Sequence, residues 1–144
     1  MNRYLPIIPG PYDAFLVARP SIIPDAGLGL STLGRDFEEG DVMCYYYGHI
    51  HNFHSAQSVS DKSYLMVVGG DVLVDAGPLP EVKARYINDP LNELFVNIRF
   101  EPEPRRFRAA VVAARRIESG EELFGAYGDA YWSQHPTPGR TRSE

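Results

Sequence analysis

Glycine and proline divide this chain into short segments. The 144 residues include 13 glycines and 12 prolines, and the runs between them are rich in β-branched and aromatic residues. Such punctuation leaves little room for a long helix and is typical of a protein built from many short strands. The sequence therefore predicts a mainly β fold of several small sheets with short helices. The expected strands cover residues 14–19, 27–33, 41–50, 63–68, 71–76, 94–100 and 107–115.

One hairpin is the clearest local feature. "SYLMVV" and "DVLVDA" are separated by Gly69-Gly70, and paired glycines accept the positive φ angles of a tight hairpin turn. Helix is expected only in short pieces, one of which begins with prolines that need no hydrogen-bond donor in a first turn. These pieces cover residues 55–62, 78–87 and 129–135.

Length and composition favour a single domain. With 44% hydrophobic and 23% charged residues the chain has an ordinary globular composition, and no apolar run approaches the ~20 residues of a membrane span. Three prolines within the first 11 residues interrupt any signal-peptide core, so secretion is not expected. Cys44 is the only cysteine, which excludes an internal disulfide. We expect an N-terminal extension at 1–13, a folded domain at 14–132 and a mobile tail at 133–144.

The net charge of −5 argues against non-specific electrostatic binding of nucleic acid, because such binding requires clustered lysine and arginine. The acidic residues gather in two clusters. Either these clusters are solvated turns, or they form a surface that attracts a basic peptide. The clusters are Asp36, Glu38, Glu39 and Asp41, and then Glu118, Glu121 and Glu122.

Four segments combine small or turn-forming residues with aromatic side chains. Taken singly, each has an ordinary interpretation, because a Gly-x-Gly is often a bulge, a tyrosine run is often packing, and Asn-Asp-Pro is a turn signal. The segments are "GLGL" (27–30), "YYYG" (45–48), "INDP" (87–90) and "GAYG" (125–128), the last followed by Tyr131 and Trp132.

In their order along the chain, these segments resemble the SET domain of protein lysine methyltransferases. "AGLGLST" is similar to the first cofactor-binding segment of that family, and "FEEGDVMCYYYGHI" to its F-x-x-G-D-x-x-x-x-Y-x-G stretch. "ARYINDP" stands where the family has Arg-Phe-Ile-Asn-His-Ser, and "SGEELFGAYG" where it has Gly-Glu-Glu-Leu and a terminal Tyr-Gly. The resemblance covers about residues 14 to 132 and implies small sheets around a C-terminal pseudoknot.

The resemblance also implies a reaction and a set of site residues. The reaction is transfer of a methyl group from S-adenosylmethionine to a lysine of a protein, usually a histone tail, and the implied compartment is the nucleus. Asn97 corresponds to a second family asparagine. The implied catalytic residues are Tyr127 and Tyr46. The implied cofactor-binding residues are Leu28, Gly29, Leu30, Tyr64, Asn88, Asp89, Tyr127 and Trp132. The implied lysine channel is lined by Tyr46, Tyr64, Gly125 and Tyr131.

Three positions depart from the family pattern. Asp89 replaces a histidine. The resemblance implies that residue 89 acts through its backbone groups, a role that an aspartate can fill, whereas a buried carboxylate without a partner would be costly. Gly125 stands where the family usually has Phe or Tyr, and Ala126 where Asp or Asn is common. A wall of the lysine pocket is therefore expected to be missing. These departures keep open an alternative, a catalytically weak or inactive SET-like domain that acts as a protein-binding module.

The chemistry implied by the resemblance needs a neutral lysine amine. With a reference pKa of about 10.4, only about one lysine in a few thousand is neutral at pH 7. A dry aromatic channel facing a cationic sulfonium favours the neutral amine, because desolvation and like charge both destabilise the ammonium form. A dedicated general base is then not required.

The stretch "HIHNFH" is the one candidate metal site. His49, His51 and His54 have a spacing that could bind zinc, but no carboxylate or thiolate lies close to them in the sequence. Surface histidines are the favoured interpretation, and no metal is assigned.

Overall fold

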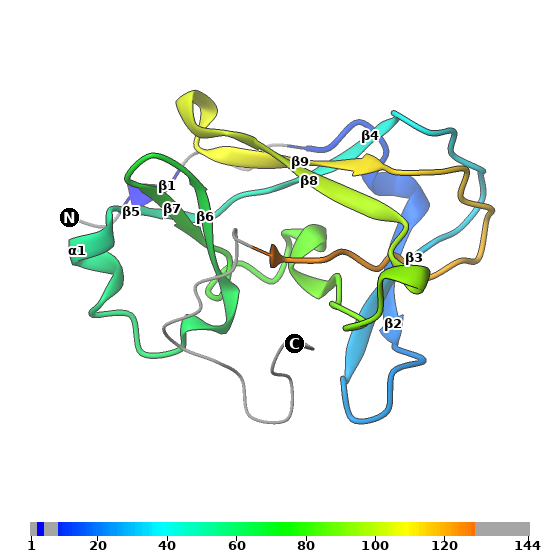
Figure 1. Cartoon of the computed structure of the whole chain (residues 1–144), viewed down its shortest axis with the longest axis horizontal. Helices are drawn as coiled ribbons and strands as arrows, with labels where there is room; N and C mark the ends of the chain where they lie inside the picture. Colours follow the sequence, from blue (N-terminus) through cyan, green and yellow to red (C-terminus); the bar gives the residue numbers. More distant parts are fainter. Residues whose placement is uncertain (1–2, 5–8, 129–144) are drawn as a thin grey trace.

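The computed structural model describes residues 3–4 and 9–128, which form three small antiparallel sheets (Figure 1). The largest sheet has the strand order β1-β5-β7-β6, the second pairs β2 with β3, and the third has the order β4-β9-β8. The predicted mainly β fold is confirmed. The strands are β1 (Arg3–Tyr4), β2 (Leu16–Pro20), β3 (Leu28–Thr32), β4 (Val42–Tyr46), β5 (His49–His51), β6 (Leu65–Gly69), β7 (Val72–Asp75), β8 (Ile98–Glu103) and β9 (Arg108–Ala113).

Helical structure is limited to short turns. The α-helix α1 (Phe53–Ala56) is capped by a reciprocal pair of bonds between Asn52 and Ser55. It ends well before the predicted boundary at residue 62, because the serines and the aspartate that follow favour turns and caps over helix. The predicted helix at 78–87 is reduced to the 3₁₀ turn η3. The 3₁₀ turns are η1 (Asp13–Phe15), η2 (Lys62–Tyr64), η3 (Lys83–Tyr86), η4 (Glu93–Phe95) and η5 (Pro104–Arg106).

The predicted hairpin is confirmed as β6 and β7. Its turn contains Gly69 and Gly70, both with positive φ, and the register shifts between Val67 and Gly69. Positive φ angles are costly for residues with a Cβ, so the glycine pair fixes where the chain reverses.

The prediction of one strand over residues 41–50 is wrong. The chain forms β4 and β5, which belong to different sheets, and changes direction at Tyr47 and Gly48. A Cβ at Gly48 would overlap the carbonyl oxygen of Asp75. Because only glycine allows this approach of two backbones, the break is set by a contact across the fold.

The predicted strand at 94–100 is also shifted. Asn92 accepts a hydrogen bond from the Leu94 amide at 3.0 Å, which begins η4 where strand was expected. Strand β8 starts only at Ile98 and continues to Glu103, through residues expected to form the connection. The connection itself is the short turn η5.

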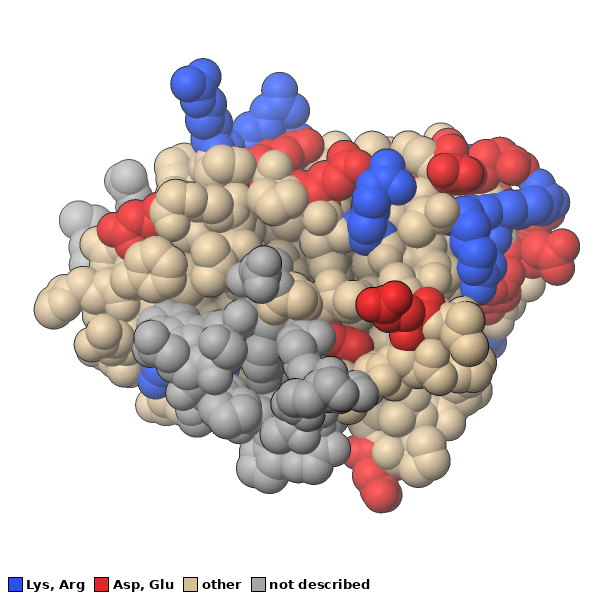
Figure 2. All heavy atoms as spheres, viewed as in Figure 1, with Lys and Arg blue, Asp and Glu red and all other residues tan. Residues whose placement is uncertain are grey.

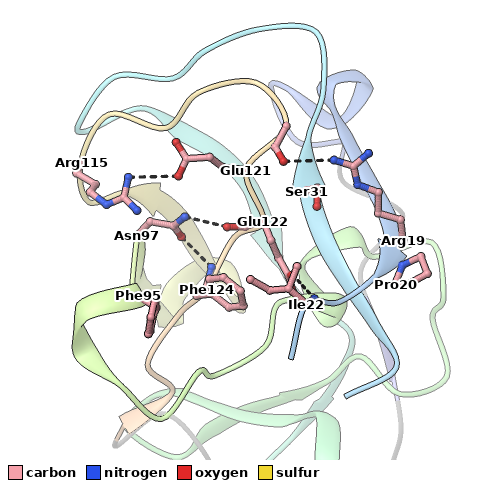
Figure 3. A pocket seen from close by; sticks show the side chains of 11 residues that line it. Arg19, Pro20, Ile22, Ser31, Phe95, Asn97, Arg115, Glu121, Glu122 and Phe124 are labelled. Atoms are coloured by element: carbon pink, nitrogen blue, oxygen red, sulfur yellow. Dashed lines mark hydrogen bonds and ion pairs between the residues drawn. The ribbon is translucent and has the colours of Figure 1, made fainter. Parts of the chain in front are cut away.

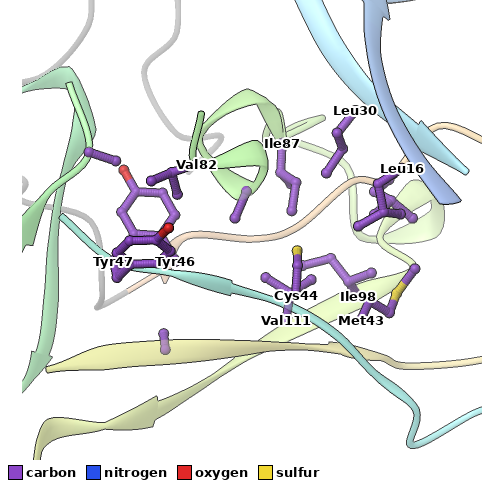
Figure 4. Packing of buried hydrophobic residues seen from close by; sticks show 14 of the residues in the cluster. Leu16, Leu30, Met43, Cys44, Tyr46, Tyr47, Val82, Ile87, Ile98 and Val111 are labelled. Atoms are coloured by element: carbon purple, nitrogen blue, oxygen red, sulfur yellow. The ribbon is translucent and has the colours of Figure 1, made fainter. Parts of the chain in front are cut away.

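A C-terminal segment links two of the sheets to the region of residue 88. Residues 122–125 form isolated bridges with β3, with the residue-88 region and with the start of β8, and this segment crosses the centre of Figure 1 in orange. This interleaving corresponds to the expected C-terminal pseudoknot. The core beneath it is drawn in Figure 4 and includes Leu16, Leu30, Met43, Cys44, Tyr46, Val82, Ile87, Ile98 and Val111.

Candidate active site

Tyr127 is held at both its backbone and its hydroxyl by one short segment. Its hydroxyl donates a hydrogen bond to the Ile87 carbonyl at 2.6 Å, and its amide donates to Asp89 Oδ2 at 3.2 Å. The ring stacks on Phe100, with the centroids 5.0 Å apart and the planes at 24°. Tyr127 is half-buried, so its position is defined while part of it faces solvent.

Tyr46, which the sequence analysis predicted as a catalytic and channel-lining residue, is buried. Its side chain is 2% exposed, and its hydroxyl donates to the Tyr64 carbonyl at 2.6 Å. Burial raises the pKa of this phenol, and the nearby Tyr127 and Asp75 raise it further. Tyr46 is therefore neutral at physiological pH. It contributes to the site as a buried ring that packs against Phe100.

Phe100 was missed by the sequence predictions. A Cβ at Gly125 would lie 2.6 Å from Ile98 Cδ1 and 2.8 Å from Phe100 Cε2. The Phe100 ring also meets the Tyr46 ring edge-on, with the centroids 6.3 Å apart. The space beside Gly125 is thus occupied by Ile98 and Phe100 from strand β8, and the missing wall of the lysine pocket stays a prediction. No local signal marks Phe100, because its approach to Gly125 depends on strand register.

Asn88 joins two of the predicted cofactor segments. Its side-chain amide donates to the Leu28 carbonyl at 3.0 Å, and its own carbonyl accepts from the Gly125 amide at 3.1 Å. Leu28 is 47% exposed, whereas Gly29 and Leu30 are buried. Of the three residues predicted on β3, only Leu28 presents its side chain to solvent beside Asn88.

The Asp89 carboxylate is bonded inside the protein. Only 7% of the residue is exposed, Oδ1 accepts from the Leu91 amide at 2.9 Å, and Oδ2 accepts from the Tyr127 amide. These two donors supply the partners that a buried carboxylate requires. The side chain of Asp89 therefore has a role that the sequence analysis did not assign to it.

Arg85 and Tyr86 anchor η3 to the segment that precedes it. The Arg85 guanidinium donates to the carbonyls of Ala76 and Gly77 at 3.2 and 3.1 Å, and lies 4.3 Å from the centroid of the half-buried Tyr64 ring. The Tyr86 hydroxyl donates to the Pro80 carbonyl at 3.0 Å. Two other predicted site residues, Tyr131 and Trp132, lie outside the described residues.

Asn97 serves the C-terminal segment directly. It is 1% exposed, and its side chain donates to the Glu122 carbonyl at 2.9 Å and accepts from the Phe124 amide at 2.8 Å. Both ends of the carboxamide are therefore satisfied by the backbone of the segment that carries Tyr127. The contact is structural, since it fixes the strand that leads to Tyr127.

A pocket of about 520 Å³ lies beside this segment (Figure 3). Its walls include Arg19, Ile22, Phe95, Asn97 and Phe124. Among the described residues, none of those predicted to bind the cofactor is part of its lining. The pocket is therefore separate from the site formed around Tyr127 and Asn88.

The acidic clusters are largely paired with basic groups or backbone amides. Arg116 bonds to Asp36 at 2.9 Å and also to Glu38, while Glu121 lies 3.4 Å from Arg115. Figure 2 shows red and blue side chains interspersed on the right of this face. Two arginines thus neutralise part of the charge in these clusters locally.

The described residues contain no group of three or more His, Cys, Asp or Glu that could hold a metal ion. The Nδ1 atom of His51 lies 2.9 Å from the Ser55 hydroxyl, and His51 is buried, so it is not a surface histidine as predicted. Within the same residues, no helix has the length and apolar character needed to cross a membrane.

A β-rich fold whose C-terminal segment passes between separate sheets and presents a tyrosine beside an Ile-Asn turn defines a SET-type domain. The sequence model of the SET domain family matches residues 27–128, and the chain belongs to this family. Its members are typically protein lysine methyltransferases. Curated proteins gave no match to this chain.

Proposed function

We propose that this domain transfers a methyl group from S-adenosylmethionine to the side-chain amine of a lysine in a protein, with a histone tail as the substrate and the nucleus as the compartment. The observation that carries the proposal is the fixed position of Tyr127, whose hydroxyl and amide are both bonded to residues 87–89. Family membership supports the reaction class.

The residues around Asn88 fit the proposed cofactor. The amino acid part of S-adenosylmethionine needs hydrogen-bond acceptors for its ammonium group and donors for its carboxylate. The Asn88 carboxamide and the Leu28 carbonyl, which are bonded to each other, include both donors and acceptors. Asn88 is 7% exposed and Leu28 is exposed beside it, so a ligand would approach this contact from the side of Leu28. When bound, S-adenosylmethionine supplies an electrophilic methyl group on a sulfonium cation.

The aromatic residues would favour the reactive form of lysine. Tyr46, Phe100 and Tyr127 form a cluster of rings in which Tyr46 is buried and the other two are half-buried. A lysine amine held against these rings would lose part of its hydration, and desolvation lowers the pKa of an ammonium group. A lysine with a lowered pKa is neutral more often near pH 7, where the reference value of about 10.4 leaves it almost fully charged. The raised pKa of Tyr46 keeps that phenol protonated, so it does not act as a base.

Tyr127 would orient the amine. Its hydroxyl proton is engaged by the Ile87 carbonyl, and a phenol oxygen is also a hydrogen-bond acceptor to which an N–H of the incoming amine could donate. Holding the nucleophile in one direction removes much of the entropic cost of the reaction. Tyr127 is thus the proposed catalytic residue, with Tyr46 and Phe100 packed around it.

The substrate proposal rests on charge and on the family. The net charge of −5 favours a basic peptide over an acidic one. Because the acidic clusters are largely paired with local groups, the attraction comes from the whole chain more than from a dedicated acidic patch.

The proposal is tested by calorimetric titration of S-adenosylmethionine into the wild type and Asn88→Ala, with a radiolabelled methyl assay on core histones. We expect binding by the wild type, loss of binding in Asn88→Ala, and label on lysine. Asn92→Ala is the matched control, since the Asn92 side chain also bonds the backbone, in this case the Leu94 amide, but only begins η4. Absence of binding by the wild type would refute the proposal. Binding without transfer to any protein would support the alternative, a protein-binding module.

A further inference from the structure

Residues 87–89 bond Tyr127 at two points, its hydroxyl and its backbone amide. The bond to the amide depends on one side chain, the carboxylate of Asp89. We propose that Asp89 is a positioning residue that fixes the backbone of Tyr127 through its side chain, an inference that rests on the proposed methyl transfer. The contact is the bond from the Tyr127 amide to Asp89 Oδ2 at 3.2 Å. Asp89 would act through Tyr127, without itself contacting the substrate or the cofactor.

The backbone around Tyr127 has few other restraints from its own side chains. Gly125 has no side chain, Ala126 has only a methyl group and is exposed, and Gly128 is exposed with φ of 50°. The backbone of Gly125 is held by its bond to the Asn88 carbonyl and its bridge to Ile98, whereas Ala126 and Gly128, the immediate neighbours of Tyr127, are exposed and have little side chain with which to fix its direction. The Phe100 contact holds the ring, and Asp89 supplies the restraint on the amide.

The carboxylate is itself held in one orientation. Oδ1 accepts from the Leu91 amide at 2.9 Å, which closes a turn in which Leu91 has φ of 56°. Bonds from amides to an ionised acceptor are stronger than neutral ones, and Asp89 is almost fully buried. Oδ1 therefore fixes the side chain within its own turn, and Oδ2 of this fixed side chain restrains the amide of Tyr127.

Two acceptors explain why an aspartate suits this position. An asparagine offers one oxygen and one N–H₂ group, so it can accept from the Leu91 amide or from the Tyr127 amide but not from both. An alanine loses both bonds. The inference thus predicts a graded series in which Asp89→Asn is less impaired than Asp89→Ala.

The experiment measures kcat, the KM for a histone peptide and the Kd for S-adenosylmethionine in the wild type, Asp89→Asn and Asp89→Ala. A misplacement of about 1 Å in a catalytic group can cost roughly 100-fold in rate. We therefore expect kcat to fall about 10- to 100-fold in Asp89→Ala and less in Asp89→Asn. The KM and the Kd should change by less than about threefold, on the same principle that only alignment is lost.

A second readout reports the anchor without the reaction. Hydrogen exchange of the Leu91 and Tyr127 amides, followed by NMR, should be slow in the wild type and faster for both amides in Asp89→Ala. In Asp89→Asn at least one of the two amides should exchange faster, because only one acceptor remains. Asp71→Ala is the matched control, because Asp71 also accepts from a backbone amide, that of Phe53 at 2.8 Å, in the β6–β7 turn. This variant should leave kcat and the exchange of the Tyr127 amide unchanged.

Three results would overturn the inference. The first is a raised Kd for S-adenosylmethionine with kcat unchanged, which would make Asp89 a cofactor ligand. The second is unchanged exchange of both the Leu91 and the Tyr127 amides in Asp89→Asn, because the single remaining acceptor cannot keep both bonds; this variant can be used even if Asp89→Ala does not fold. The third is a wild type that transfers no methyl group: the proposed function then fails, the catalytic role fails with it, and the exchange data alone decide whether Asp89 anchors Tyr127.

Discussion

Phe100 occupies the space that a side chain at residue 125 would need. The ring of Phe100 lies 2.8 Å from the position of a Cβ on Gly125, and it stacks on the ring of Tyr127. Two residues from different strands thus complement each other, one by its bulk and the other by its lack of a side chain. The aromatic surface beside Tyr127 comes from β8, although the family pattern places it on the segment of Tyr127 itself.

The first prediction concerns this complementarity. Gly125→Ala should destabilise the protein by about 1–3 kcal/mol, because a methyl group is forced against Phe100 and Ile98 in a packed region. Phe100→Leu should relieve part of the clash, so the double variant should be more stable than the sum of the two single effects predicts. Urea unfolding of the four proteins measures the coupling. Additive effects would mean that the two positions do not share this space.

Removal of the Phe100 ring should change the product. Phe100→Ala opens room beside the Tyr127 hydroxyl, so a lysine that already carries methyl groups can turn its nitrogen toward the donor again. We expect mass spectra of a histone peptide to shift toward the more methylated forms. Phe95→Ala is the control, since Phe95 is exposed and lies on η4. An unchanged product distribution in an active Phe100→Ala would contradict the assignment.

The Tyr127 hydroxyl can be tested separately from its ring. Tyr127→Phe keeps the stacking on Phe100 and removes the group that donates to the Ile87 carbonyl. We expect methyl transfer to fall by a factor of about 100 or more, while the Kd for S-adenosylmethionine changes little, since orientation of the nucleophile is lost. Tyr86→Phe loses a comparable hydroxyl-to-carbonyl bond, to Pro80, and should retain activity. Equal losses in both variants would point to a general effect on stability.

Asn97 should matter for stability more than for binding. Asn97→Ala leaves the buried Glu122 carbonyl and the Phe124 amide without their partner, and an unsatisfied buried group costs about 1–3 kcal/mol. We therefore expect a loss of about 2–4 kcal/mol in the free energy of unfolding from the two groups together. Asn92→Ala, which removes one exposed cap, should cost about 1 kcal/mol. Equal costs for the two variants would refute the structural role of Asn97.

The parts of the fold that follow from local chemistry could be predicted from the sequence. The hairpin of β6 and β7 is determined by Gly69 and Gly70 between two runs of β-forming residues, and both signals lie within a few positions. The motif order also identified the family, because each motif is a short continuous segment.

The parts that depend on distant contacts could not be predicted. The break between β4 and β5 follows from the approach of Gly48 to Asp75, and the wall beside Tyr127 follows from Phe100 meeting Gly125. The role of the Asp89 carboxylate depends on an amide 38 positions further along the chain. Local propensity contains no information about such pairings, which arise only when the sheets assemble.

The last prediction concerns pH and His51. Burial lowers the pKa of this histidine, with His49 adding to the effect and Asp75 opposing it. The unfolded chain therefore takes up a proton near the ordinary value of about 6.5, while the folded chain does so only at lower pH. Stability should be highest above that value and should fall as the pH decreases through and below it.

Urea midpoints at pH 7.5 and at pH 5.5 measure this effect. His51→Gln, which does not titrate, should show a smaller decrease between the two values than the wild type. His54→Gln is the matched control, because His54 is exposed on α1 and should leave the decrease unchanged. If His51→Gln and the wild type lose the same stability at pH 5.5, proton uptake by His51 does not set this dependence, and other groups bind the protons on unfolding.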